Sequence, residues 1–377
     1  MLAEDKQVTS RVQLLDLLRL VAVAAVIAYH YGFRGPPAQG ATQVALPWMA
    51  GFAQYGFLGV PIFFVISGFV IAYSAEGRSA LGFAIARFSR IYPTFLLCMT
   101  LTFVTVLVMG QPQFESSFAQ WLANLFIAAP IFRQSYMDGA YWSLVVEVVF
   151  YAWVAILMAA KVFPRRIDLI VLIWLAITFA NELTIDAPIF ERIFLADDSG
   201  FFAVGLMIYE FYRGRRDAKL YIMFALSVGT AIFQCQHRAT HIDSPTGTSF
   251  DDAVIAAICV SSIVIIFAAT LIRKLPLPAN LVMAIGGLTY PLYLLHQQVG
   301  YVVLSAVQPT SIAWAVVAIV SGIMLLSWIV WRFFESPVHR WTKNILTVEA
   351  ARRGWLTRAT GATPQSFSSP SQSSLVK

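Results

Sequence analysis

The feature that most constrains this chain is an apolar run from Leu14 to Gly32. Three polar side chains interrupt it, those of Asp16, Arg19 and His30. A membrane's hydrocarbon core is crossed by about 20 mostly apolar helical residues, so the run is long enough to span a bilayer. At about 100° per residue, Arg19 and His30 project from one face, about 16 Å apart along the axis.

A guanidinium and an imidazole inside a membrane are costly unless they face a protein interior or a wet cavity. The alternative is that Arg19 and His30 anchor the two helix ends at the interfaces. Their shared face, with Asp16 one turn before Arg19 as a local partner, favours a polar stripe that lines a site.

Composition places the chain among integral membrane proteins. Hydrophobic residues make up 59% of its 377 residues and charged residues only 12%, which is outside the range of soluble domains. The apolar runs predict an all-α polytopic protein with about ten transmembrane helices, and segment 118–132 is expected to be re-entrant or interfacial. The expected spans are 12–31, 51–74, 91–109, 141–160, 167–183, 200–212, 220–234, 253–272, 281–304 and 312–333.

Loop charges set the orientation, because Lys and Arg gather in cytoplasmic loops. Alternate loops hold the basic clusters, so both termini are expected in the cytoplasm. The net charge of +6 then reflects topology, not nucleic-acid binding. We expect a transmembrane domain over 1–341 and a disordered, Ser-rich cytoplasmic tail over 342–377. The three cysteines have no metal-site spacing, and we expect them to pack between helices, with no metal bound.

Small residues mark the second span, which carries Gly56, Gly59 and the pair Ser67-Gly68. Such residues let helices pack closely, and they would also leave room for a slender substrate. The segment that follows places Arg87 and Arg90 on one helical face. They are either cytoplasmic anchors or phosphate ligands, since arginine makes bidentate contacts to phosphate oxygens.

Two later spans carry polar groups at membrane depth. The fourth places Ser143 and Glu147 one helical turn apart, and an intramembrane carboxylate indicates a functional site. Its alternative is a neutralised structural carboxyl group. The ninth carries Tyr293 and His296, which we expect to line the site, although a lone histidine among aromatics is often a core residue.

These stretches resemble the membrane acyltransferase-3 family, the polytopic O-acyltransferases of cell-surface glycans. The matching elements are Arg19 with ten residues before His30, the run GVPIFFVISGF, the basic RFSRIYP, YWSLVVEVVFY and the Tyr-Leu-Leu-His element. The resemblance covers nearly the whole chain. It implies a stand-alone acyl-CoA-dependent O-acyltransferase in a bacterial inner (plasma) membrane.

The resemblance also implies roles for the polar residues. His30 would be the catalytic base or a transient acyl carrier, and Glu147 would orient it. Arg19, Ser67, Arg87 and Arg90 would meet acetyl-CoA, which acts as donor substrate with no permanently bound cofactor. Ser143, Tyr293 and His296 would line the site. Expected partners are the lipid bilayer, acyl-CoA and a saccharide or glycolipid acceptor.

Two other classes of protein fit parts of the pattern. A secondary transporter would use Arg19, His30, Glu147 and His296 as a relay, but the second half of the chain lacks matching charged positions. A haem protein would use His30 and His296 as axial ligands, which their apparently different depths disfavour.

Overall fold

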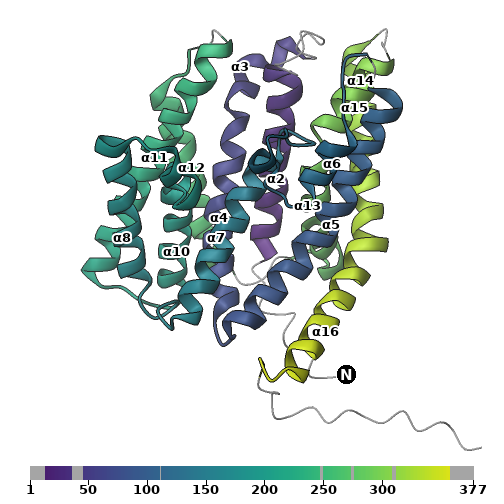
Figure 1. Ribbon diagram of the computed structural model, residues 1–377. Helices are drawn as coiled ribbons and strands as arrows, with labels where there is room; N and C mark the ends of the chain where they lie inside the picture. The colour runs from purple at the N-terminus through teal and green to yellow at the C-terminus, as the bar shows by residue number, and fades with distance from the viewer. Residues whose placement is uncertain are drawn as a thin grey trace, which may run out of the picture.

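The computed structural model describes residues 13–35, 46–110, 112–246, 249–272, 276–307 and 311–356, and all regular structure in these residues is helical (Figure 1). This confirms the predicted all-α class. The first half contains α2 Gln13–Tyr29, η1 His30–Arg34, η2 Pro47–Met49, α3 Ala50–Ala53, η3 Gln54–Leu58, α4 Gly59–Ala75, α5 Ala80–Met109, α6 Phe118–Asn124, η4 Ala129–Phe132, α7 Tyr141–Ala159 and α8 Ile167–Ala180. The second half contains η5 Asn181–Ile185, α9 Pro188–Ile193, η6 Ala196–Asp198, α10 Ser199–Tyr212, α11 Ala218–Thr246, α12 Asp252–Leu271, α13 Ala279–Leu295, α14 Gln298–Val307, α15 Ile312–Ile329, η7 Val330–Glu335 and α16 Ser336–Arg352.

Eight helices in the described part of the chain are long and apolar enough to cross a membrane. The shorter apolar helices α13 and α14 accompany them. The chain is therefore a polytopic membrane protein, while the ten predicted spans do not each correspond to one long helix. The eight are Gln13–Arg34, Ala50–Ala75, Ala80–Met109, Tyr141–Ala159, Ile167–Ile185, Ala218–Ile242, Asp252–Leu271 and Ile312–Arg352.

Helix α11 extends to Thr246, well past the expected end at 234. Two further predicted boundaries were wrong for identifiable reasons. Helix α5 begins at Ala80, well before the expected 91, because Ser79 caps it by accepting a hydrogen bond from Gly82 N at 3.1 Å. The expected span 281–304 is two helices, α13 and α14. The carboxylate of Asp138 accepts the Gln298 N–H at 2.8 Å, so that amide bonds outside its own helix and α14 starts anew.

The structure also defines segment 118–132 and the C-terminal end of the last span. Segment 118–132 contains two short pieces, α6 and η4, and neither is long enough to span a bilayer. At the C-terminal end the last span continues through η7 into α16, so the expected domain boundary at 341/342 falls inside a helix. Residues 357–377 of the expected tail lie outside the described residues.

Helix α2 packs between α4 and α13, near the centre of the bundle (Figure 1). Glycine makes the first of these contacts close. A Cβ at Gly56 would lie 2.1 Å from Ala25 O, and one at Gly59 would lie 2.4 Å from Ala22 O. The predicted packing role of these small residues is confirmed.

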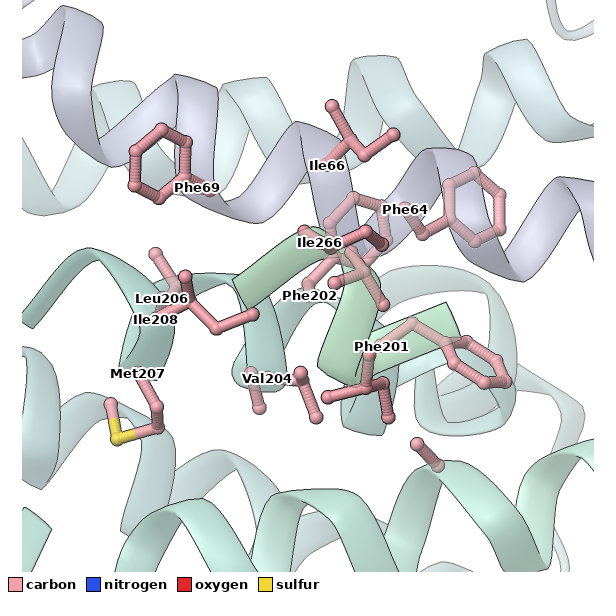
Figure 2. Packing of buried hydrophobic residues seen from close by; sticks show 14 of the residues in the cluster. Phe64, Ile66, Phe69, Phe201, Phe202, Val204, Leu206, Met207, Ile208 and Ile266 are labelled. Carbon is pink, nitrogen blue, oxygen red and sulfur yellow. The ribbon is translucent and has the colours of Figure 1, made fainter. Parts of the chain in front are cut away.

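Helices α4 and α10 form the most extensive contact of the core, and Figure 2 shows their apolar side chains together with Ile266 of α12. Here too the backbones touch. A Cβ at Gly68 would lie 2.4 Å from Phe202 O, and one at Gly205 would lie 2.1 Å from Val65 O. The free cysteines Cys98, Cys235 and Cys259 are all buried, as expected for packing residues.

Candidate functional site

A cavity of about 490 Å³ lies beside the N-terminal half of α2, and we call it the Glu147 cavity. Helices α2, α4, α5, α7 and α13 all contribute to its wall. Most of the site residues expected from the sequence meet in it. They are Arg19, Ser67, Arg87, Arg90, Ser143, Glu147 and Tyr293.

The lining of the Glu147 cavity carries four arginines and three carboxylates, those of Asp16, Glu76 and Glu147. Arg19, Arg78, Arg87 and Arg90 line it. Arg87 lies over the rings of Phe83 and Tyr151, with its Cζ 5.7 and 5.9 Å from their centroids, and its buried Nε has no hydrogen-bond partner among the described residues. A guanidinium held in this way presents N–H groups that an anionic ligand can take up.

Hydrogen bonds hold two of the other charged groups, Arg19 within α2 and Glu147 both within α7 and across to α4. Arg19 Nη1 donates to Asp16 Oδ1 at 3.0 Å, so the predicted pairing is confirmed. Glu147 Oε1 accepts hydrogen bonds from Ser67 Oγ, at 3.0 Å, and from the hydroxyl of Tyr151. Glu147 is thereby fixed to α4 and to its own helix.

A second cavity of about 470 Å³ lies beside the C-terminal end of α2, and we call it the His30 cavity. His30 opens the π-helical turn η1, and its Nδ1 lies 3.0 Å from the hydroxyl of Tyr301. That hydroxyl donates to His30 O at 3.1 Å. A phenol has one proton, so both contacts are hydrogen bonds only if Nδ1–H donates to Tyr301. The Nε2 atom of His30 then carries a lone pair.

His296 lies next to His30, with ring centroids 5.2 Å apart. This corrects the expectation that the two imidazoles sit at different depths. His296 Nδ1 is 2.7 Å from Tyr293 O, and because a carbonyl only accepts, Nδ1 carries the proton. Its side chain is only 1% exposed, and Nε2 has no hydrogen-bond partner in the described part of the chain. Both imidazoles thus make their hydrogen bond at Nδ1, but only His30 is among the residues that line the two cavities.

Tyr293 and Val60 line both cavities. Between the cavities, the hydroxyls of Tyr293 and Ser143 share a hydrogen bond of 2.6 Å. The Glu147 cavity adjoins Arg19 and the His30 cavity adjoins His30, so the two spaces follow one face of α2 from end to end. The predicted polar stripe on α2 is therefore present. The Ser143–Tyr293 hydrogen bond lies where the two cavities along this stripe meet.

Glu147 and His30, which were predicted to interact, do not share a hydrogen bond in the structure. Glu147 was expected to orient the imidazole of His30, but its hydrogen bonds go to Ser67 and Tyr151. Tyr301 takes that place at His30 Nδ1. The error arose because spacing within single helices does not reveal which side chain of a distant helix meets which.

Two residues that line the His30 cavity, and a third that binds the lining residue Gln298, were not predicted from the sequence. Tyr301 and Arg238 stand on helices far along the chain from His30, and no local pattern connects them. Asp138 binds Ala140 N and Gln298 N, both at 2.8 Å, and so ties α7 to α14. An Asp-Gly pair just before an apolar helix was the only signal of a capping role.

Comparison with known proteins agrees with the geometry. A family model described as an acyltransferase domain, acyltransferase-3, matches residues 12–332. The chain is 27% identical over 266 residues to the exopolysaccharide production protein ExoZ of Rhizobium meliloti (strain 1021), covering 64% of this chain and 75% of ExoZ. It is also 37% identical over 90 residues to an O-acetyl transferase of Shigella phage Sf6, covering 23% of this chain and a quarter of that protein. No solved structure matched significantly.

Proposed function

Because the chain belongs to the acyltransferase-3 family, we propose that it moves an acetyl group from acyl-coenzyme A to a hydroxyl group of a saccharide or glycolipid. The names of its relatives support this proposal, since one is an exopolysaccharide production protein and the other an O-acetyl transferase. A bacterial inner membrane, with the donor in the cytoplasm, is the setting that fits such a reaction.

The arginines of the Glu147 cavity support its assignment to the donor. Coenzyme A carries phosphates, and guanidinium groups bind phosphate oxygens with charge-assisted hydrogen bonds. Arg87 and Arg90, in the N-terminal half of α5, would meet these phosphates together with Arg19, which lines the same cavity. Ser67 and Ser143 line the same cavity and would contact the thioester arm, and Ser67 is held by its hydrogen bond to Glu147.

The observation that carries the proposal is the pair of Tyr301 contacts at His30, which assigns the ring proton to Nδ1 and leaves a lone pair on Nε2. Nε2 takes the proton of the acceptor hydroxyl as its oxygen attacks the thioester carbon. The carbon–sulfur bond then breaks, and the imidazolium returns the proton to the thiolate. The products are the ester and the free thiol.

The same lone pair would serve a covalent route in which His30 carries the acyl group to the acceptor. The two routes differ in what accumulates without acceptor. A covalent route leaves acyl group on the protein after incubation with labelled donor, and a general-base route leaves none. Mass spectrometry of the peptide that contains His30 distinguishes them.

Substitution of His30 tests the function itself. We expect His30→Ala to lower acyl transfer by about 10²–10⁴-fold, the usual contribution of a positioned general base. Donor binding and protein level should stay unchanged. His241→Ala is the matched control, since His241 is exposed on α11 and outside both cavities.

The measurements are O-acyl content of surface glycans, coenzyme A binding and membrane protein level. If a stably expressed His30→Ala protein still transfers acyl groups, His30 does not carry the chemistry. The alternative, a transporter with an Arg/His/Glu relay, would then gain support.

A further inference from the structure

Among the described residues, the charged side chains that line the His30 cavity are all positive. Among the described residues that line this cavity there are two arginines, Arg34 and Arg238, and no aspartate or glutamate. Arg34 comes from η1 and Arg238 from α11, so two separate elements bring positive charge to the same space. A cavity with this lining favours an anionic group.

Arg34 lies on the π-helical turn that begins with His30, one turn along the same face. Its only hydrogen bond in the described structure is a long one, Nη1 to the hydroxyl of Tyr29 at 3.4 Å, and no described carboxylate forms an ion pair with it. A half-buried guanidinium gains little from such a contact. Its remaining N–H groups stay open to a ligand.

The guanidinium of Arg238 has hydrogen-bond partners for only some of its N–H groups among the described residues. Its Nη2 binds Asp198 Oδ1 at 2.5 Å, and its Cζ lies 5.0 Å from the ring centroid of Trp142. Its Nη1 is buried without any hydrogen-bond partner among the described residues. Leaving a buried charged N–H unsatisfied is costly, and a ligand oxygen would remove this cost.

From these contacts we infer that the acceptor carries an anionic oxygen group, a carboxylate or a phosphate, and that Arg34 and Arg238 bind it in the His30 cavity. This inference rests on the proposed function. Binding the anion beside His30 would present a neighbouring hydroxyl to Nε2. Arg34 and Arg238 would thus select acidic saccharides over neutral ones, a choice that His30 alone cannot make.

The test measures acceptor kinetics in purified, membrane-reconstituted protein, with thiol release from acetyl-CoA as the readout. One acceptor is a glucuronate-containing oligosaccharide, and its partner is the same oligosaccharide with its carboxylates reduced to alcohols. A third is a neutral sugar on a polyprenyl pyrophosphate, which separates a lipid-linked phosphate from a sugar carboxylate. Inorganic phosphate serves as a competitor.

We expect wild-type protein to show a KM at least about tenfold lower for one anionic acceptor than for its neutral partner, which corresponds to one charge-assisted hydrogen bond. Arg34→Gln should reduce this preference by raising KM for the anionic acceptor toward the value for its neutral partner. Arg34→Lys should restore part of it, because an ammonium keeps the charge without the planar fork. Arg133→Gln is the matched control, since Arg133 is exposed and outside the His30 cavity.

Equal KM values for charged and neutral acceptors in wild-type protein would overturn the inference and leave the proposed function intact. Absence of transfer to every acceptor would instead contradict the proposed function. If Arg34→Gln raised KM only for succinyl-CoA relative to acetyl-CoA, the arginine would serve an acidic acyl group, and the acceptor assignment would be wrong.

Discussion

Arg87 shows how one residue combines packing with an unused charge. Its guanidinium lies over two aromatic rings, while Nε meets no described partner. A side chain placed in this way is stiff before any ligand arrives, which lowers the entropic cost of binding. The donor therefore meets a prepared cation instead of a mobile one.

The first prediction concerns this cation and its neighbour. Replacing Arg87 and Arg90 together with Ala should weaken coenzyme A binding by at least about tenfold, because each guanidinium contact to a phosphate is charge-assisted. Equilibrium binding to purified protein measures it. The pair Arg165→Ala with Arg166→Ala is the control, since both residues are exposed and outside the cavities. Unchanged affinity in the Arg87/Arg90 variant would make them topology anchors.

Asp138 is a second residue with a measurable consequence, and it lies outside the membrane-spanning helices. Burial raises the pKa of its carboxyl group to about 7, against the opposing effect of the N–H groups of Ala140 and Gln298. A raised pKa means that the folded protein holds this proton more tightly than the unfolded chain does. Its contribution to stability is complete below about pH 4 and is lost as the pH rises to about 7.

Asp138→Asn should remove this pH dependence, because an amide does not titrate. Unfolding temperature in detergent, measured at one scan rate at pH 5 and pH 8, gives the comparison. The wild-type protein should lose stability relative to the variant between these values. A difference between variant and wild type that is the same at both pH values would show that Asp138 keeps an ordinary pKa.

At the scale of elements, glycine sets the distance between α4 and α10. The backbone of Val65 occupies the place where a side chain at Gly205 would begin. Because α4 also carries Ser67, this contact fixes one wall of the Glu147 cavity. Close packing and site geometry therefore depend on the same pair of helices.

Gly205→Ala should destabilise the protein by about 1–3 kcal/mol, the usual cost of overpacking, because the methyl group would meet backbone atoms. Gly229→Ala is the matched control. It adds the same methyl group to α11 where no atom lies within 4 Å, and helix propensity makes it neutral or stabilising. Thermal unfolding of both variants in detergent measures the effect. Equal stability of the two variants would refute the packing argument.

The sequence predicts which segments form helices, but it does not predict which side chains of different helices meet. Arg19 and His30 share a face because helical periodicity is local, so the sequence alone predicts it. The bond from His30 to Tyr301 joins positions far apart in the chain, and nothing near either residue signals it. The break before Gln298 was missed for a similar reason, since its cause is the distant carboxylate of Asp138.

At the scale of the whole molecule, the remaining prediction is orientation. Both termini are predicted to be cytoplasmic, which places Arg133 outside and Arg165 inside. Arg133→Cys should react with a membrane-impermeant maleimide in intact cells, and Arg165→Cys only after permeabilisation. Background labelling should be low, because the three native cysteines are buried. Labelling of Arg165→Cys in intact cells would reverse the topology.

The hydrogen bond between Ser143 and Tyr293 has an electrical consequence. The two cavities lie along opposite halves of α2 and share Val60 and Tyr293 in their walls, so only a few side chains separate them there. If both cavities hold water, most of the membrane voltage would fall across the side chains that separate them, including Ser143 and Tyr293. Moving one ion past these side chains costs or yields about 2.3 kcal/mol per 100 mV. An uncharged acetyl group crosses without that work, whereas ions are held back, so the cell would keep its voltage while the ester is made.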